Sequence, residues 1–208
     1  CVPYPGDTVH EVRKWLGLVA HVGATGPPRP ELPVTPEEEH EAESLLAPLD
    51  RTRPLVALHA GSRDPARRWP TERFAALAER LWEAYGCQIV LTGVPEDAGL
   101  NADVARICRA PVLDLSGRTG IGSLAALLDR VDLLVTNDSG PSHVAWARGV
   151  PSVILFGPTD PARWAPLEAG LHRAVVSPGH DLQRLELQHV WPAVTGMLER
   201  SRSRRGGV

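Results

Sequence analysis

The chain has 208 residues, of which 43% are hydrophobic, and its formal net charge is −3. This length and composition are those of a globular protein that can bury a substantial core, as one domain or as two small ones. The basic residues are scattered apart from a cluster at 200–205, which excludes the charge pattern of a nucleic-acid-binding protein, and no apolar run approaches the roughly 20 residues of a membrane-spanning helix.

The three cysteines indicate a reducing compartment. Cys1, Cys87 and Cys108 form an odd set without the spacing of a metal site, which is typical of a cytoplasmic protein. We expect Cys87 and Cys108 to be small buried hydrophobic residues. The start of the chain has no signal-peptide pattern, and because its first residue is Cys1 and not methionine, we expect it to be part of a longer protein.

The first 50 residues contain two predicted helices and a connecting segment. Residues 9–18 have a helical pattern, and the proline- and glycine-rich residues 23–33 cannot sustain regular structure, so they form a linker or a crossover. Thr35 is suited to cap a second helix, which has Pro36 and three glutamates in its first turn and runs to about residue 46.

A repeating pattern of strands and helices begins at about residue 51. The predicted strands are 55–59, 88–92, 112–115, 131–137, 152–156 and 173–176, and the predicted helices are 71–85, 95–109, 121–130, 141–148 and 187–200. Alternation at this spacing favours parallel crossovers, so residues 51–200 are predicted to form one doubly wound, Rossmann-like α/β domain around a parallel sheet. Residues 201–208 are predicted to be a disordered basic tail.

The chain is organised around residues 131–151, where a strand, a polar turn and an Ala-rich helix follow one another. Asp138 or Ser139 can cap this helix, and Pro141 suits its first turn. Ligands of open parallel sheets bind beyond the carboxyl ends of the strands, where helix N-termini offer free N–H groups to anions such as diphosphates. Residues 138–143 are therefore the first candidates for a binding site.

Three further loops fall on the same edge of the predicted sheet. Residues 59–70 combine Gly61 and Ser62 with the guanidinium groups of Arg63, Arg67 and Arg68, which suit phosphate oxygens. The alternative is a solvent-exposed basic loop with a tryptophan, Trp69, packed beneath it.

The second and third of these loops are 92–97 and 156–161. Glu96 in the first of them can accept hydrogen bonds from ribose hydroxyls, or it can simply be a favourable charge at a helix start. The loop 156–161 has the sequence Phe-Gly-Pro-Thr-Asp-Pro, and no part of a ligand is assigned to it.

Several other chemistries are excluded by pattern. Asp138, Ser139 and His143 do not form a hydrolase triad, because no Gly-x-Ser-x-Gly elbow is present and residues that cap one helical turn cannot form the relay. Neither a Gly-x-Gly-x-x-Gly motif nor a Walker loop is present. The sequence has no Asp-x-Asp pair and its histidines are dispersed, so we expect no metal and no cofactor. His143 alone is also compatible with a structural role.

The order of five motifs resembles the C-terminal half of glycosyltransferase family 9, whose members include the ADP-heptose:lipopolysaccharide heptosyltransferases. The resemblance covers about residues 35–195. It is carried by His59-Ala-Gly-Ser, Arg67-Arg-Trp-Pro, Thr92-Gly-x-x-Glu96, Asn137-Asp-Ser-Gly-Pro-Ser-His143 and Phe156-Gly-Pro-Thr-Asp-Pro.

The resemblance implies a GT-B enzyme with two Rossmann-like domains. Residues 35–200 would be the domain that binds the nucleotide-sugar donor, ADP-heptose or a relative, and residues 1–34 would be a remnant of the N-terminal domain and the interdomain linker. The missing domain would supply the acceptor site and a catalytic aspartate, so no catalytic residue is expected in this chain and the chain alone is expected to be inactive. Transfer would be metal-independent and inverting.

The resemblance also assigns site residues. Gly61, Ser62 and Arg67 would face the diphosphate, Glu96 the ribose and Thr119 the base. Asp138 would face the sugar hydroxyls, and the helix start would surround the diphosphate and sugar with Ser139, Gly140 and His143. Where Arg67 stands the family usually has lysine, and a planar fork binds phosphate with a different geometry from a point charge.

The partners implied are a nucleotide-sugar donor and a glycan or lipid A-core acceptor, without nucleic acid. The full enzyme would be cytoplasmic and lack a transmembrane segment, and it would be able to associate with a membrane surface. Two alternatives stay open. One is a nucleotide-sugar epimerase of similar GT-B shape, and the other is a non-catalytic nucleotide- or sugar-binding module.

Overall fold

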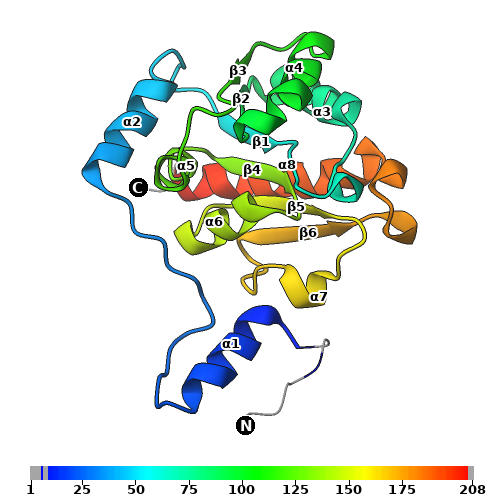
Figure 1. Cartoon of the computed structure of the whole chain (residues 1–208). Coiled ribbons are helices and arrows are strands. Elements are labelled where there is room, and N and C mark those ends of the chain that lie inside the picture. Colours follow the sequence, from blue (N-terminus) through cyan, green and yellow to red (C-terminus); the bar gives the residue numbers. More distant parts are fainter. Residues whose placement is uncertain (1–5, 7–8, 206–208) are drawn as a thin grey trace.

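The computed structural model describes residue 6 and residues 9–205 (Figure 1). Cys1 and residues 206–208 of the expected tail lie outside the described residues. The strands are β1 Leu55–His59, β2 Gln88–Leu91, β3 Val112–Asp114, β4 Leu133–Asn137, β5 Ser152–Phe156 and β6 His172–Val176. The helices are α1 Glu11–Ala20, α2 Pro36–Leu46, α3 Thr71–Tyr85, α4 Ala98–Ile107, α5 Ile121–Leu128, α6 Gly140–Arg148, α7 Pro161–Trp164 and α8 Leu187–Arg205. Four 3₁₀ turns are η1 Pro65–Arg67, η2 Pro95–Asp97, η3 Pro178–His180 and η4 Leu182–Arg184.

The six strands form one parallel sheet in the order β3-β2-β1-β4-β5-β6. This confirms the predicted doubly wound α/β fold. The chain turns from β1 toward β2 on one side and later returns to place β4 on the other side of β1. The switch point of the topology therefore lies between β1 and β4, where such sheets bind their ligands.

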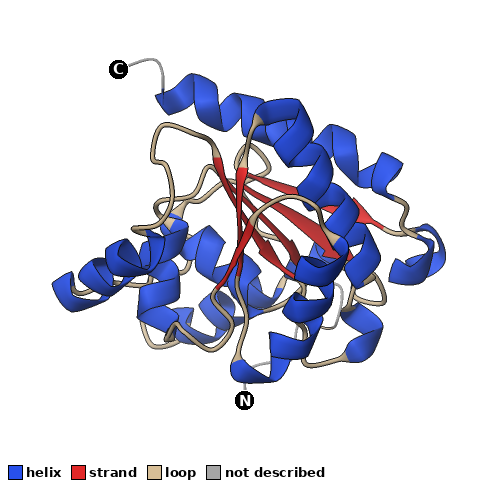
Figure 2. Cartoon of the chain, turned by 90° about the horizontal axis from the view of Figure 1, so that it is seen from above, coloured by secondary structure: helices blue, strands red, loops and turns tan. Residues whose placement is uncertain are grey.

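Helices cover both faces of the sheet (Figure 2). In β1, Val56 and Leu58 belong to the core formed with α3, α4 and α8, whereas Leu55 and Ala57 belong to the core formed with α2, α5 and α6. Successive side chains of a strand point to opposite faces, so a strand buried on both faces is mostly apolar. All five residues of β1 are buried.

Local signals set the ends of several helices. Thr35 caps α2 with a capping box, in which its hydroxyl accepts from the Glu38 N–H and the Glu38 carboxylate accepts from the Thr35 N–H. Gly86 ends α3 and Gly149 ends α6, both in the left-handed region, with φ of 65° and 68°. Cys87 and Cys108 are buried free thiols, as predicted.

Several boundaries differ from the sequence prediction, most of them by one or two residues. The first helix begins at Glu11 because the His10 side chain accepts a hydrogen bond from the Val12 N–H and caps it. The helix expected from residue 95 starts with the separate turn η2. The tail was expected to be disordered from residue 201, but α8 continues to Arg205. Most side chains of this last turn are polar, which suits an exposed helix, whereas Ser201 is buried.

Residues 21–35 connect α1 to α2 without a helix or strand. This connection is attached to the body of the domain, because Arg148 donates to the Leu32 carbonyl at 2.9 Å and Arg29 lies 3.7 Å from Glu168. Among the described residues, none of the helices combines the length and the apolar content that crossing a bilayer would require.

Candidate functional site

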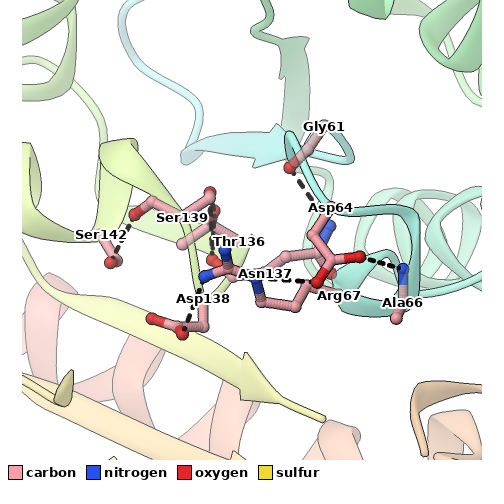
Figure 3. A network of polar contacts seen from close by, with 9 residues as sticks. All are labelled: Gly61, Asp64, Ala66, Arg67, Thr136, Asn137, Asp138, Ser139 and Ser142. Atoms are coloured by element: carbon pink, nitrogen blue, oxygen red, sulfur yellow. Dashed lines mark hydrogen bonds and ion pairs between the residues drawn. The ribbon is translucent and has the colours of Figure 1, made fainter. Parts of the chain in front are cut away.

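The candidate site is the row of loops that follows the carboxyl ends of the strands. The loops after β1 and β4 lie next to each other because these strands are paired, with His59 opposite Thr136. Their side chains form the polar network of Figure 3. We call this row of loops, which comprises residues 60–70, 92–97, 115–120, 138–143 and 157–160, the carboxyl-edge shelf.

Asn137, the last residue of β4, holds the two central loops together. Its amide nitrogen donates to the Ala60 carbonyl at 2.9 Å, and its amide oxygen accepts from the Trp69 N–H at 3.0 Å. Asn137 is fully buried, and both polar atoms of its side chain have the hydrogen-bond partners that a buried amide needs. Asn137 belongs to the motif at residues 137–143, and no role was predicted for it from the sequence.

Trp69 lies beneath the basic loop. It is 1% exposed, and its indole N–H donates to the Leu185 carbonyl at 2.6 Å. The guanidinium of Arg68 donates to the Ser62 carbonyl at 2.8 Å, which fixes the curve of the loop. Arg68 is thus committed to the loop itself, and Arg67 is the arginine of this pair that faces the neighbouring loop.

Arg67 lies between two carboxylates (Figure 3). Its Nη1 is 3.6 Å from Asp138 Oδ2, and its Nε is 3.8 Å from Asp64 Oδ2. Both separations are longer than a hydrogen bond, so the guanidinium donors are not consumed by these contacts. The Asp138 side chain is 4% exposed, and its expected contact with sugar hydroxyls would have to occur beside this ion pair.

The N-terminus of α6 opens onto the shelf. Ser139 is the N-cap residue, but its side chain makes no capping hydrogen bond, and its hydroxyl contacts the Asn137 carbonyl at 3.2 Å instead. Among the described residues, none would have an atom within 4 Å of a Cβ added at Gly140. The first turn of α6 is therefore not capped by a side chain, and an anion can approach its backbone.

His143 lies one turn into α6 and is half-buried. Its ring meets that of Trp164 edge to face, with the centroids 6.5 Å apart. Burial lowers the pKa of His143, with a smaller opposing effect from the Asp138 carboxylate, while His10 lowers it further. The neutral imidazole is favoured, and it can donate or accept one hydrogen bond.

Gly61 is a glycine because Asp97 occupies the space beside it. A Cβ at Gly61 would collide with the Asp97 carboxylate, which is buried and accepts from the Val94 N–H at 3.1 Å. This contact joins the loop after β1 to the loop after β2. Asp97 was not singled out from sequence, because a second acid beside Glu96 reads as one more charge at a helix start.

Glu96 and Thr119 lie toward the β2 and β3 side of the shelf. Glu96 is exposed in η2, and Thr119 is half-buried in the loop before α5. Their loops touch, since Gly117 donates to the Gly93 carbonyl at 2.8 Å and a Cβ at Gly117 would lie 3.0 Å from Pro95 Cγ. In the part of the chain that the structure describes, the ion pairs of Arg67 involve neither side chain, so the predicted site residues form two groups on one edge.

The arrangement does not support hydrolase chemistry. Ser139 contacts Thr136 and the Asn137 carbonyl, whereas His143 contacts Trp164 and Asp138 pairs with Arg67. Among the described residues, no group of three His, Cys, Asp or Glu side chains could hold a metal ion. A cavity of about 990 Å³ lies away from the shelf, between the connection at 27–33 and the end of α6.

Comparisons with known proteins match the chain to one family. The sequence model of glycosyltransferase family 9 (heptosyltransferase) matches residues 3–186. Lipopolysaccharide heptosyltransferase 2 of Escherichia coli K12 is 36% identical over 137 residues, which are 62% of this chain and 37% of that protein. The chain thus aligns with well under half of this relative.

Two solved structures are similar over nearly the whole chain. The glycosyl transferase family 9 protein from Veillonella parvula DSM 2008 has a TM-score of 0.87 and 26% identity, covering 96% of this chain and 63% of that one. The E. coli ADP-heptose lps heptosyltransferase II has a TM-score of 0.76 and 26% identity, covering 91% and 59%. Both matches extend the similarity from the sequence to the overall fold.

Proposed function

The chain belongs to glycosyltransferase family 9, and from this premise we propose that its carboxyl-edge shelf binds the donor of a heptosyltransferase of lipopolysaccharide biosynthesis. The donor class is a nucleotide-sugar, ADP-heptose or a close relative, as the names of the relatives indicate. The observation that carries the proposal is the position of Arg67 beside the uncapped N-terminus of α6 at the switch point of the sheet.

The order of the strands supports an order of ligand parts. Thr119 follows β3 and would lie near the base, and Glu96 follows β2 and would accept from the ribose. The diphosphate would lie across the loops after β1 and β4, where Arg67, Gly61 and Ser62 meet the N-terminus of α6. An elongated nucleoside diphosphate can thus cross the sheet edge from strand to strand, at about 4.8 Å per strand.

The chemistry expected of these residues is electrostatic. A departing nucleoside diphosphate gains negative charge, which Arg67 and the amide groups of Gly140 and its neighbours can stabilise without a bound metal. Ser139 and His143 would complete the hydrogen bonds around the diphosphate and the sugar. We propose metal-independent, inverting transfer for the whole protein on this basis.

We also propose that this chain alone binds the donor without transferring its sugar. Inversion needs a base that takes the proton of the acceptor hydroxyl. The acids of the shelf have other tasks. Asp138 pairs with Arg67, and Asp97 is buried against Gly61. Asp64 accepts from the Ala66 N–H, and Glu96 is assigned to the ribose. Asp160 accepts from the Ala162 N–H at 2.9 Å, and the base would therefore come from outside these loops.

The acceptor proposed for the whole protein is a lipopolysaccharide-core glycan on lipid A, because the relatives are named for lipopolysaccharide. Such an acceptor is anchored in a membrane. We accordingly propose a cytoplasmic protein that reaches the membrane surface peripherally.

Calorimetry with ADP, UDP and GDP tests the donor assignment. We expect ADP to bind most tightly, and uridine preference together with conversion of a UDP-sugar in the absence of an acceptor would favour the epimerase alternative. A transfer assay with ADP-heptose and a lipopolysaccharide-core acceptor tests the proposal that this chain alone does not transfer the sugar. Turnover by the 208-residue chain alone would contradict the proposal that its shelf lacks the base.

A further inference from the structure

The loop after β5 has no role in the binding scheme above, although it lies on the same edge. Gly157 is buried, and a Cβ there would lie 3.5 Å from the carbonyl of Ala66, the residue before Arg67. The hydroxyl oxygen of Thr159 is buried, and it has no hydrogen-bond partner among the residues that the structure describes. A buried polar atom without a partner is unusual and needs an explanation.

Trp164, the last residue of α7, borders the shelf beside this loop. It is half-buried, and its ring lies next to that of His143, with 60° between the planes. The Arg163 guanidinium lies over the indole, with Cζ 5.2 Å from the ring centroid, and its Nε is 2.5 Å from Glu11 Oε1. The indole is therefore held in place from α1 and α7, while His143 connects it to the start of α6.

We propose that Trp164 is a specificity-determining residue that packs against the sugar of the donor, with the Thr159 hydroxyl as a neighbouring hydrogen-bonding group. This inference rests on the proposed function. If base, ribose and diphosphate lie over β3, β2 and the β1–β4 pair, the next part of the ligand falls at the end of β4 and β5. That is where His143, Trp164 and Thr159 are found.

The side chains of His143, Trp164 and Thr159 have the chemistry that suits a sugar. A pyranose presents a face of C–H groups, which packs on an aromatic ring, and a rim of hydroxyls, which need hydrogen-bond partners. Trp164 offers the ring and Thr159 a hydroxyl, and the half-buried His143 offers one donor or acceptor. Ligand sites commonly combine such an apolar wall with a few polar groups.

The test compares the binding of ADP and of ADP-heptose by calorimetry, in the unmutated chain, Trp164→Leu and Trp164→Phe. Leucine fills part of the volume without an aromatic ring, whereas phenylalanine keeps one. We expect Trp164→Leu to lower the affinity for ADP-heptose relative to ADP by about three- to tenfold, the range of an aromatic contact, and Trp164→Phe to change this ratio by less than about twofold. Trp82→Leu, on the partly exposed α3 surface away from the shelf, is the control and should leave the ratio unchanged.

An unchanged ratio in Trp164→Leu would overturn the inference, and so would an equal loss of affinity for both ligands, which would show that Trp164 only supports the fold. Failure of the proposed function would give a different result in this experiment. In that case the unmutated chain would not bind ADP, and the inference would fall with the function on which it rests.

Discussion

Arg67 and Asp138 form an ion pair across the switch point of the sheet. The arginine side chain is 33% exposed and the aspartate 4%, so the pair presents its cationic half to solvent and keeps its anionic half in the protein. A carboxylate in this position holds the guanidinium at the edge of the shelf. It also means that loss of the arginine would leave a buried charge without its partner.

Gly61→Ala should destabilise the protein. The new methyl group would collide with the Asp97 carboxylate, which is buried and cannot simply rotate into solvent. We expect a loss of roughly 1–3 kcal/mol in the free energy of unfolding, the usual cost of forcing extra volume into a packed site. Denaturant unfolding of the purified variant measures it.

The matched control for this substitution is Gly99→Ala. Gly99 lies in α4, and a Cβ there would meet no atom of the described residues within 4 Å. Alanine at such a helical position should stabilise the protein by about 0.5–1 kcal/mol. Equal stability of Gly61→Ala and the unmutated chain would show that Asp97 does not restrict this loop.

Gly140→Ala separates ligand binding from folding. A methyl group at this position enters open space at the start of α6, so the melting temperature should change little. If the diphosphate approaches this backbone, the methyl group occupies its path, and we expect ADP affinity to fall about tenfold, or about 1.4 kcal/mol. Undiminished ADP affinity would place the diphosphate elsewhere.

Stability should decrease as the pH falls from about 6.5 toward 4. Burial lowers the pKa of His59 and of His172 to about 4 each, so both are neutral in the folded protein while the unfolded chain binds their protons. Between pH 6 and 5, each histidine should contribute a slope of about 1 kcal/mol per pH unit in the free energy of unfolding. His59→Asn should remove the contribution of one histidine from this slope. His40→Asn, at an exposed position, is the control and should leave the slope unchanged.

Chelation should not affect donor binding. The described residues contain no cluster of metal-binding side chains, and Arg67 and the N-terminus of α6 are expected to neutralise the diphosphate. We expect the same calorimetric affinity for ADP with and without EDTA. A strong reduction by EDTA, reversed by added Mg²⁺, would contradict the metal-independent mechanism.

The fold could be predicted from sequence because its elements carry local signals. The run Leu55–Leu58 is apolar throughout, and Gly86 and Gly149 end helices in the conformation that glycine adopts most easily. The end of α8 was missed because Ser and Arg repeat without an apolar stripe, while the burial of Ser201 depends on tertiary contacts.

The loops of the site could be predicted, but not their mutual contacts. Strand alternation places the loops after β1 and β4 on one edge, yet the contact of Gly61 with Asp97 spans two loops 36 positions apart. The role of Asn137 likewise depends on the Ala60 carbonyl and the Trp69 N–H, which only folding brings within reach. Sequence spacing carries no information on such contacts.

The variant Arg67→Ala must be compared with a second variant, because it leaves the Asp138 carboxylate buried without its cation. In the double variant Arg67→Ala/Asp138→Asn the uncompensated charge is removed, while the loss of the phosphate-binding group remains. We expect ADP affinity to stay low in the double variant, and the melting temperature to recover relative to Arg67→Ala.

The most direct test of the central claim, that the carboxyl-edge shelf binds the diphosphate of the donor, is calorimetric titration of ADP into the unmutated chain and this double variant. The account predicts binding by the unmutated chain that is weakened by roughly 1.5–3 kcal/mol in the variant, the range for hydrogen bonds to charged groups. Equal ADP affinity in the two proteins, at similar melting temperatures, would contradict it.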